Sequence, residues 1–174
     1  GMLYILDIKT GKEIKKIEVS SYIGNNIAAD RGAAYVAHYG NKVAAFSLAD
    51  TRQIWEFGER DFPYYAAPAV SGNWVIAGSR DKRVYGIDRA KGEKKWVFRT
   101  RGDVDSSPVI CADTHVIFGS NDGFFYAANL ADGAEVWRYE IGAPVKSAPA
   151  VAGDWILIGS DDGGVYAFKN GKAK

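Results

Sequence analysis

A repeat of about 41 residues runs through this chain of 174 residues and sharply limits how it can fold. Tryptophan recurs at Trp55, Trp96 and Trp137. A proline, a Gly-Ser pair and a tyrosine recur with the same period: Pro68, Pro108 and Pro149; Gly78-Ser79, Gly119-Ser120 and Gly159-Ser160; Tyr85, Tyr126 and Tyr166. Four independent markers with one period indicate a tandem array in which each unit packs on its neighbours.

Each unit divides into four short segments. In the unit 106–146 they are a small apolar segment with Pro108, an apolar segment ending in Gly119-Ser120, a segment around Tyr126 and one around Trp137. No window shows the apolar spacing of a long helix. Four short strands in about 40 residues are typical of a propeller blade. The sequence therefore predicts an all-β protein, a β-propeller of about four four-stranded blades.

The repeat boundaries predict a single repeat domain over residues 1–174. Its expected parts, in chain order, are an N-terminal half-blade 1–26, blades at about 27–65, 66–105 and 106–146, and a C-terminal partial blade 147–169.

Composition excludes several classes of function. Lys and Arg number 22 against 21 Asp and Glu, so the net charge of +1 gives no electrostatic basis for binding nucleic acid or an anionic membrane. Cys111 is alone, which excludes an intrachain disulfide and a cysteine zinc cluster. No apolar run reaches the length of about 18–20 residues that a membrane span needs.

The turn between the third and fourth segments carries a family resemblance. The stretches 86–96 and 127–137, and in part 7–13, resemble the Ala-x-Asp-x-x-Thr-Gly-Lys-x-x-Trp motif of pyrroloquinoline-quinone-type (quinoprotein) β-propeller repeats. The chain is similar to the propeller lipoprotein of the outer-membrane assembly machinery, which implies a periplasmic or extracytoplasmic location. The resemblance also implies that each tryptophan docks flat on the neighbouring blade beside the turn glycine. The residues concerned are Trp55, Trp96, Trp137, Gly92 and Gly133.

Two positions depart from this motif. The turn 47–51 has Thr51 where the glycine is expected, so we expect a distorted turn. Lys15 stands where the first repeat should have its tryptophan, so we expect that docking contact to be missing.

The family includes quinone-dependent dehydrogenases, but the resemblance does not extend to their chemistry. Those enzymes resemble one another in a calcium-binding Glu and Asn, a catalytic Asp and two adjacent cysteines. Cys111 cannot supply such a pair, so we expect no cofactor and no enzyme activity. His38 and His115 are expected to pack in the repeats, and Asp103, Asp105 and 161–163 to serve turns rather than a metal.

The loops that join successive blades are the candidate binding surface. Phe62, Tyr64 and Tyr65 lie in one loop, and we expect Arg101, Asp105 and Lys146 to lie on the same face. The alternative is that Tyr64 and Tyr65 belong to the core. The leading hypothesis is a non-catalytic scaffold or protein-binding module whose partner is unknown. The alternatives are a fragment of a quinone-dependent dehydrogenase and a carbohydrate- or small-ligand-binding propeller.

The order of segments also bears on ring closure. The chain starts with a third and a fourth strand and ends with a first, second and third strand. We therefore expect a homodimer in which each N-terminal pair of strands completes its partner's last blade, giving an eight-bladed ring. The competing interpretation is that the chain is an excised part of a longer propeller.

Overall fold

The computed structural model describes residues 1–169, and every regular element within them is a β-strand. That part of the chain has no helix that could cross a membrane. The prediction of an all-β propeller fold is confirmed.

The strands form five antiparallel sheets in chain order. The first sheet is a hairpin of β1 (Met2–Leu6) and β2 (Glu13–Glu18). The second contains β3 (Ala28–Asp30), β4 (Ala33–His38), β5 (Lys42–Ser47) and β6 (Gln53–Phe57). The third contains β7 (Ala69–Ser71), β8 (Trp74–Ser79), β9 (Arg83–Asp88) and β10 (Lys94–Arg99). The fourth contains β11 (Val109–Cys111), β12 (His115–Gly119), β13 (Phe124–Asn129) and β14 (Glu135–Glu140). The fifth contains β15 (Ala150–Ala152), β16 (Trp155–Gly159) and β17 (Val165–Lys169).

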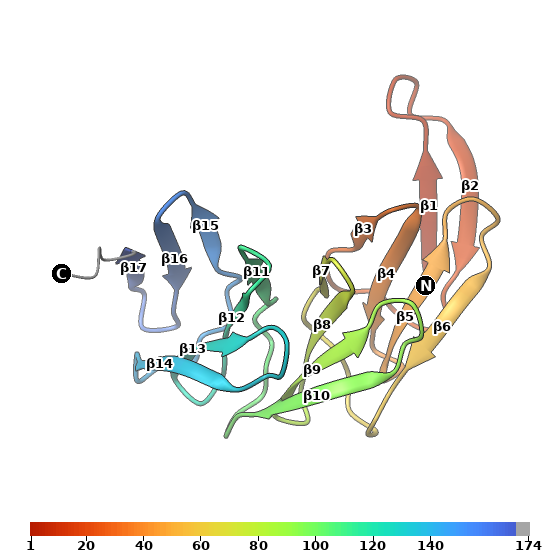
Figure 1. Ribbon diagram of the computed structural model, residues 1–174. Helices are drawn as coiled ribbons and strands as arrows, with labels where there is room; N and C mark the ends of the chain where they lie inside the picture. Colours follow the sequence, from red (N-terminus) through yellow and green to blue (C-terminus); the bar gives the residue numbers. More distant parts are fainter. Residues whose placement is uncertain (170–174) are drawn as a thin grey trace.

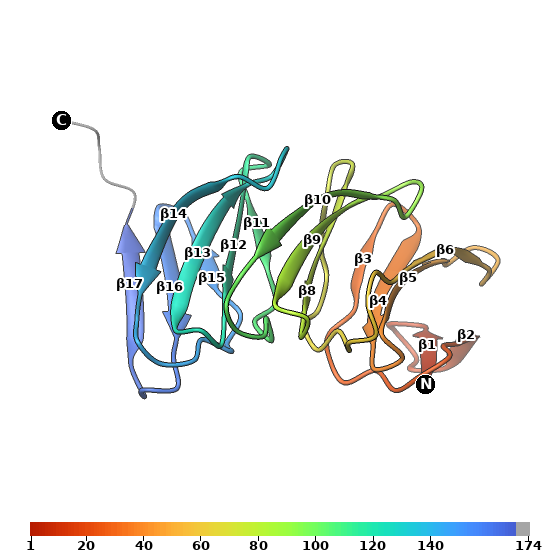
Figure 2. The ribbon, with the colours of Figure 1, turned by 90° about the horizontal axis from the view of Figure 1, so that it is seen from below.

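The five sheets stand one behind another along an arc. Figures 1 and 2 show the β1–β2 hairpin at one end of the arc and the β15–β17 sheet at the other. Each inner sheet is therefore covered on both faces. This double cover explains why all six residues of β4 and the four central residues of β9 are buried.

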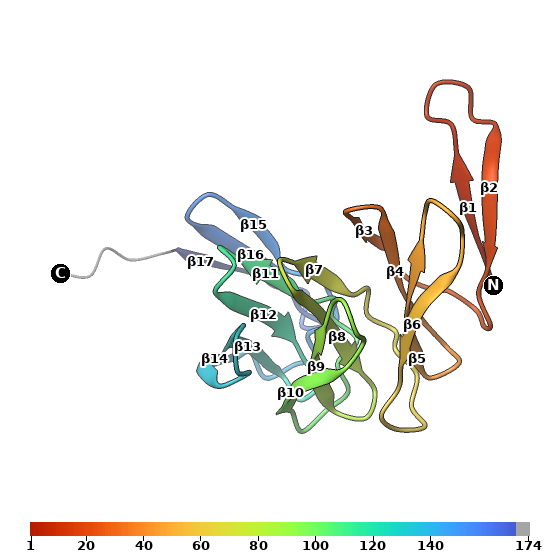
Figure 3. The ribbon, with the colours of Figure 1, turned by 45° about the vertical axis from the view of Figure 1, so that its right-hand side comes forward.

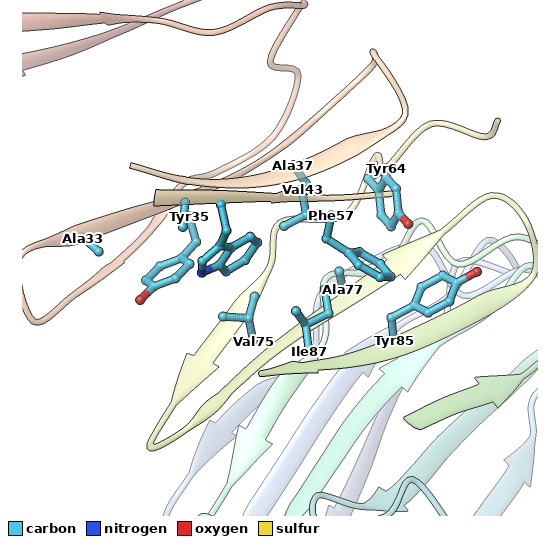
Figure 4. Packing of buried hydrophobic residues seen from close by; sticks show 12 residues of the cluster. Ala33, Tyr35, Ala37, Val43, Phe57, Tyr64, Val75, Ala77, Tyr85 and Ile87 are labelled. Carbon is cyan, nitrogen blue, oxygen red and sulfur yellow. The ribbon is translucent and has the colours of Figure 1, made fainter. Parts of the chain in front are cut away.

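Side chains alternate between the two faces of each strand. We call the face toward the C-terminal neighbour the forward face and the opposite one the backward face. In β9, Val84 lies on the forward face and packs with the next sheet, while Tyr85 and Ile87 lie on the backward face. Figure 4 shows Phe57 and Tyr64 meeting Tyr85 in the layer between the second and third sheets. The core is thus a series of layers between sheets.

Two tryptophans join neighbouring sheets. The Nε1 of Trp55 donates a hydrogen bond to the Arg89 carbonyl (2.7 Å), and that of Trp96 donates to the Leu130 carbonyl (2.9 Å). A Cβ on Gly92 would lie 2.7 Å from the Trp55 ring, which shows how closely the indole covers this turn.

The same arrangement recurs one repeat later. A Cβ on Gly133 would lie 2.5 Å from the ring of Trp96. Trp137 is half-buried and stacks on Phe168 with ring centroids 5.8 Å apart. Residues 170–174, which follow β17 in the sequence, lie outside the described residues.

The expectation of a distorted turn at 47–51 was wrong. Thr51 adopts φ +64°, close to +71° at Gly92, and its N–H donates to the Ser47 carbonyl (2.9 Å) as that of Gly92 donates to Asp88 (2.8 Å). The hydrogen bonds hold the usual turn, although a β-branched residue is strained in this conformation. Threonine in place of glycine at position 51 therefore adds backbone strain but leaves the path of the backbone unchanged.

The expectation that Lys15 makes no docking contact also needs correction. The Lys15 ammonium donates a hydrogen bond to the Ala49 carbonyl, in the turn that a tryptophan would otherwise cover. The polar part of the contact is kept, and the flat apolar ring is lost. Because no indole lies over this turn, the Cβ of Thr51 does not meet the ring that a Cβ on Gly92 would meet.

Candidate binding face

Loops and turns gather at one end of every sheet. Because successive strands are antiparallel, each turn between second and third strands lies at the same end as the loops that join neighbouring sheets. We call this end the loop–turn face, formed by the loops 19–27, 58–68, 100–108 and 141–149 and the turns 39–41, 80–82, 120–123 and 160–164.

Backbone hydrogen bonds tie each loop to the turn that follows it. The N–H of Tyr39 donates to the Tyr22 carbonyl (3.0 Å), and the N–H of Arg80 donates to that of Pro63 (3.2 Å). Two further bonds repeat the pattern: Asn121 to Asp103 at 2.8 Å and Asp161 to Pro144 at 3.0 Å. These hydrogen bonds hold the backbone of the face in one conformation, so the positions of its side chains are preorganised.

Aromatic rings cover the N-terminal half of the face. Tyr22 meets Tyr39 edge-on at 4.9 Å, and Tyr39 stacks on Tyr65 at 4.2 Å between ring centroids. The guanidinium of Arg80 lies 3.7 Å from the centroid of the Tyr65 ring. Tyr22 is 65% exposed and Tyr39 38%, so the rings remain open to a partner.

Polar and charged side chains lie next to these rings on the loop–turn face, in the turns and loops of the third and fourth sheets. Asp105 accepts two hydrogen bonds from Arg80, at Nε (2.8 Å) and at the terminal nitrogen (3.0 Å), and a third from the Asn121 amide (3.1 Å). The hydrogen bond to Asp105 raises the pKa of Arg80, because the carboxylate stabilises the cation. We call Tyr22, Tyr39, Tyr65, Arg80, Asp105 and Asn121 the aromatic–ionic row.

The predicted binding residues fall into three groups: members of the aromatic–ionic row, other residues of the loop–turn face, and the buried Tyr64. Tyr65 and Asp105 belong to the row, Phe62 is 45% exposed in the loop that also carries Tyr65, and Lys146 pairs with Asp161 on the same face. Arg101 is exposed, and its backbone N–H donates to the Asp122 carboxylate (2.8 Å).

Tyr64 lies in the core, so the alternative interpretation, which placed both Tyr64 and Tyr65 there, holds for Tyr64 and not for Tyr65. It is 1% exposed and packs near Tyr85, and burial raises the pKa of its phenol. It therefore contributes to the face only by supporting the loop beneath Tyr65.

Four members of the row were not predicted: Tyr22, Tyr39, Arg80 and Asn121. Three of them do carry a signal, because Tyr39, Arg80 and Asn121 follow one another at intervals of 41 residues. Each stands directly after His38, Ser79 or Ser120, which share one position in the repeat. The varied chemistry at this position concealed the period.

The remaining polar groups serve the fold. The Tyr126 hydroxyl donates to the Asp122 carboxylate (2.9 Å), and Tyr85 and Asp81 form the same pair in the preceding sheet. Burial raises the pKa of the Cys111 thiol. Between residues 1 and 169, no three His, Cys, Asp or Glu side chains form a group that could hold a metal ion.

Comparisons with known proteins agree with this architecture. The family model of outer membrane protein assembly factor BamB matches residues 1–110 and 101–174. A curated protein of that name from Nitrosomonas eutropha is 26% identical over 103 residues, which are 58% of this chain and 24% of that protein.

Solved structures share the fold. BamB from Moraxella catarrhalis superposes with a TM-score of 0.84 at 19% identity, over 97% of this chain and 56% of that one. The computationally designed Ika8 protein gives 0.84 at 15% identity, over 96% of this chain and 52% of that one. The designed Ika4 protein gives 0.78 at 14% identity, over 88% of this chain and 94% of that one.

The chain thus spans about half of the BamB structure and about a quarter of the curated relative. The family model, by contrast, accounts for all 174 residues. Together with the repeated docking of tryptophan on a glycine turn, this match shows that the chain belongs to the family of outer membrane protein assembly factor BamB.

Proposed function

We propose that this chain is a non-catalytic scaffold that binds a protein partner outside the cytoplasm through its loop–turn face. The observation that carries the proposal is the aromatic–ionic row. In this row the stacked rings of Tyr39 and Tyr65 contact the guanidinium of Arg80, which is hydrogen-bonded to Asp105. Tyrosine and arginine are the residues that most often anchor protein interfaces.

Preorganisation supports this proposal. The loops are hydrogen-bonded to the turns, and the rings of Tyr39 and Tyr65 are already stacked before any partner binds. A partner that uses such a surface loses little side-chain entropy at this side of the interface. Asp105 has its carboxylate occupied by Arg80 and Asn121, so it positions Arg80 rather than offering itself to a ligand.

The name of the relatives suggests the class of partner. The relatives carry the name outer membrane protein assembly factor BamB. We infer from this name that the chain likewise contacts components of outer-membrane protein assembly. An extracytoplasmic location follows from the same inference.

Titration with purified components of the outer-membrane assembly machinery tests the proposal. The Tyr22→Ser/Phe62→Ser double variant removes two exposed rings of the face, and we expect a loss of affinity of at least tenfold. Ile8→Ser is the matched control, because Ile8 is fully exposed but lies in the β1–β2 turn at the opposite end of the sheets.

Equal binding by the double variant and the wild type would contradict a role for this face. Absence of binding by the wild-type chain to every component would contradict the proposed partner class. Isothermal titration calorimetry gives both results in one series.

A further inference from the structure

A cavity of about 560 Å³ lies between the second and third sheets, at the end opposite to the loop–turn face. All of its lining residues come from these two sheets and the turns within them. Figure 3 shows both sheets in the interior of the arc, with β1–β2 beyond the second and β11–β14 beyond the third. The walls of the cavity therefore belong to interior sheets, and its volume lies in the range of about 300–1,000 Å³ that is typical of small-molecule sites.

The second sheet has a small residue at a position where the other sheets carry a large ring. Ala33, the first residue of β4, holds the position that Trp74 holds in β8. His115 and Trp155 hold it in β12 and β16. Figure 4 shows Ala33 and Tyr35 at the same end of the layer between the second and third sheets. The corresponding cavity beside Trp74, one repeat later, measures only about 260 Å³, as expected where a ring takes up the space.

Arg89 contributes a buried charge to the lining of the cavity. It holds the position of Leu130 in the next repeat, and its side chain is 10% exposed. Its Nε donates to the Tyr35 hydroxyl (2.7 Å), Nη1 to the Asp30 carboxylate and the Gly72 carbonyl (3.1 Å), and Nη2 to the Asp30 carbonyl (2.9 Å). These bonds fix the guanidinium in place, and the Asp30 carboxylate balances its charge.

Two exposed cations, Arg31 and Lys91, also line the cavity. Lys91 holds the position of Asp132 in the next repeat, so the sign of the charge is reversed at this gap. The Nε of Arg31 lies 3.7 Å from the Asp30 carboxylate, which Arg89 already binds. Asp30 therefore cannot balance both arginines, and positive charge remains at the cavity.

The carboxylate of Asp88 lines the cavity as well, but it serves its own turn. It accepts hydrogen bonds from the N–H groups of Ala90 and Lys91, both at 3.0 Å. The ammonium of Lys95 lies 3.4 Å from its second oxygen. Asp88 is thus occupied, and the lining, which has three cations against this one carboxylate, favours a negatively charged ligand.

We propose that this cavity binds a small organic anion with an apolar part. The charged group pairs with Arg31 and Lys91, and the apolar part lies against Ala33 and Ile54, which is 40% exposed. An aliphatic carboxylate and a phosphate monoester both have this chemistry, because each accepts charge-assisted hydrogen bonds from cationic side chains. The site shares no residue with the aromatic–ionic row, so it is independent of the proposed function.

Two-dimensional amide NMR with octanoate, octyl phosphate and octanol as probes tests the proposal. We expect saturable shifts of the backbone N–H resonances of Arg31, Asn73 and Lys91 with at least one of the two anions. Octanol has the same apolar part without the charge, so it should bind at least about tenfold more weakly. The preference between the two anions identifies the head group.

Two substitutions test the two halves of the site. Ala33→Trp introduces the side chain found at this position in β8 and fills the cavity, and Lys91→Asp introduces the charge of Asp132. Each should weaken binding of the anion at least about tenfold. Lys16→Asp is the matched control, because it makes the same change of charge at an exposed position of β2 outside the cavity and should bind like the wild type.

Four outcomes would overturn the proposal: no saturable shift with either anion, shifts confined to residues outside the cavity, octanol binding as tightly as the better anion, and equal weakening by Lys16→Asp and Lys91→Asp. Thermal unfolding of each variant shows whether it is folded. Because Lys91 is exposed, Lys91→Asp should keep the wild-type melting temperature and so tests the site even where Ala33→Trp disturbs the packing.

Discussion

His38 fills a position that serine holds in the other repeats. The hydroxyls of Ser79 and Ser120 accept hydrogen bonds from the N–H groups two residues later, both at 3.2 Å. The Nδ1 of His38 accepts the equivalent bond from Gly40 at 3.1 Å, and the side chain is 1% exposed. The imidazole must therefore be unprotonated at Nδ1 to close the turn between β4 and β5.

This geometry predicts a pH-dependent stability. Burial lowers the pKa of His38 in the folded protein, so below the ordinary value of about 6.5 the unfolded chain binds more protons than the native one. The free energy of unfolding should fall as the pH drops from about 7.5 to about 5. Urea denaturation at a series of pH values measures this slope.

His38→Ser is the matched variant, because serine is the residue of the other repeats. The variant should lose the part of the slope that falls between these pH values. The same slope in both proteins would show that His38 is not its source.

Tryptophan docking gives a second prediction at the residue scale. Trp96 is 7% exposed and bonded to the next sheet, so Trp96→Ala should lower the free energy of unfolding by about 3–5 kcal/mol. Lys15→Ala removes only a partly exposed hydrogen bond and should lose about 1 kcal/mol or less. Comparable losses in urea denaturation would contradict the assignment of the docking position.

At the scale of elements, the turn after β5 and the strand β2 depart from the repeat together. The turn has Thr51 in place of glycine, and β2 has Lys15 in place of the tryptophan that would lie over that glycine. In the next repeat, Trp55 leaves no room for a Cβ on Gly92. The two departures are therefore compatible with each other at a single interface, although each alone would break the pattern.

A double-mutant cycle tests this coupling. Lys15→Trp alone should destabilise the protein, because the indole meets the Thr51 side chain. Thr51→Gly removes the strain of a β-branched residue at φ +64°, and the double variant should exceed the sum of the single effects by about 1–3 kcal/mol. Thr51→Ala is the control: it retains the Cβ, so it should show no such coupling with Lys15→Trp. Additive free energies of unfolding in the glycine cycle would refute the coupling.

At the scale of the whole molecule, the buried core consists of layers between neighbouring sheets. We expect pyrroloquinoline quinone with calcium to produce no thermal shift and no dehydrogenase activity. The reasons are the single Cys111 and the absence of a metal-binding cluster within residues 1–169. A ligand that binds only the native state must raise its stability, so a saturable rise in melting temperature would overturn this prediction.

Much of the architecture follows from the sequence alone. The period of Trp55, Trp96 and Trp137 identifies the repeat, and the alternation within it gives the strands, because local patterns are enough to specify elements that pack only on neighbours. Sequence analysis placed Phe62, Tyr65, Arg101, Asp105 and Lys146 in loops of the candidate face, and their role in binding stays a prediction. Arg80 and Tyr39 were not predicted, because these turn residues meet Asp105 and Tyr65 of the inter-sheet loops only in the folded chain.

The turn at Thr51 and the contact of Lys15 show what the tertiary structure alone decided. Motif comparison predicts a distorted turn and a missing contact, since it evaluates each position separately. In the folded chain, backbone hydrogen bonds hold Thr51 in the glycine conformation, and the long side chain of Lys15 reaches the carbonyl of Ala49. The sequence determined which segments become strands and in what order they stack. Only the packing of one sheet on the next decided which side chains meet, because those contacts join residues about 34 positions apart whose neighbours along the chain carry no record of the pairing.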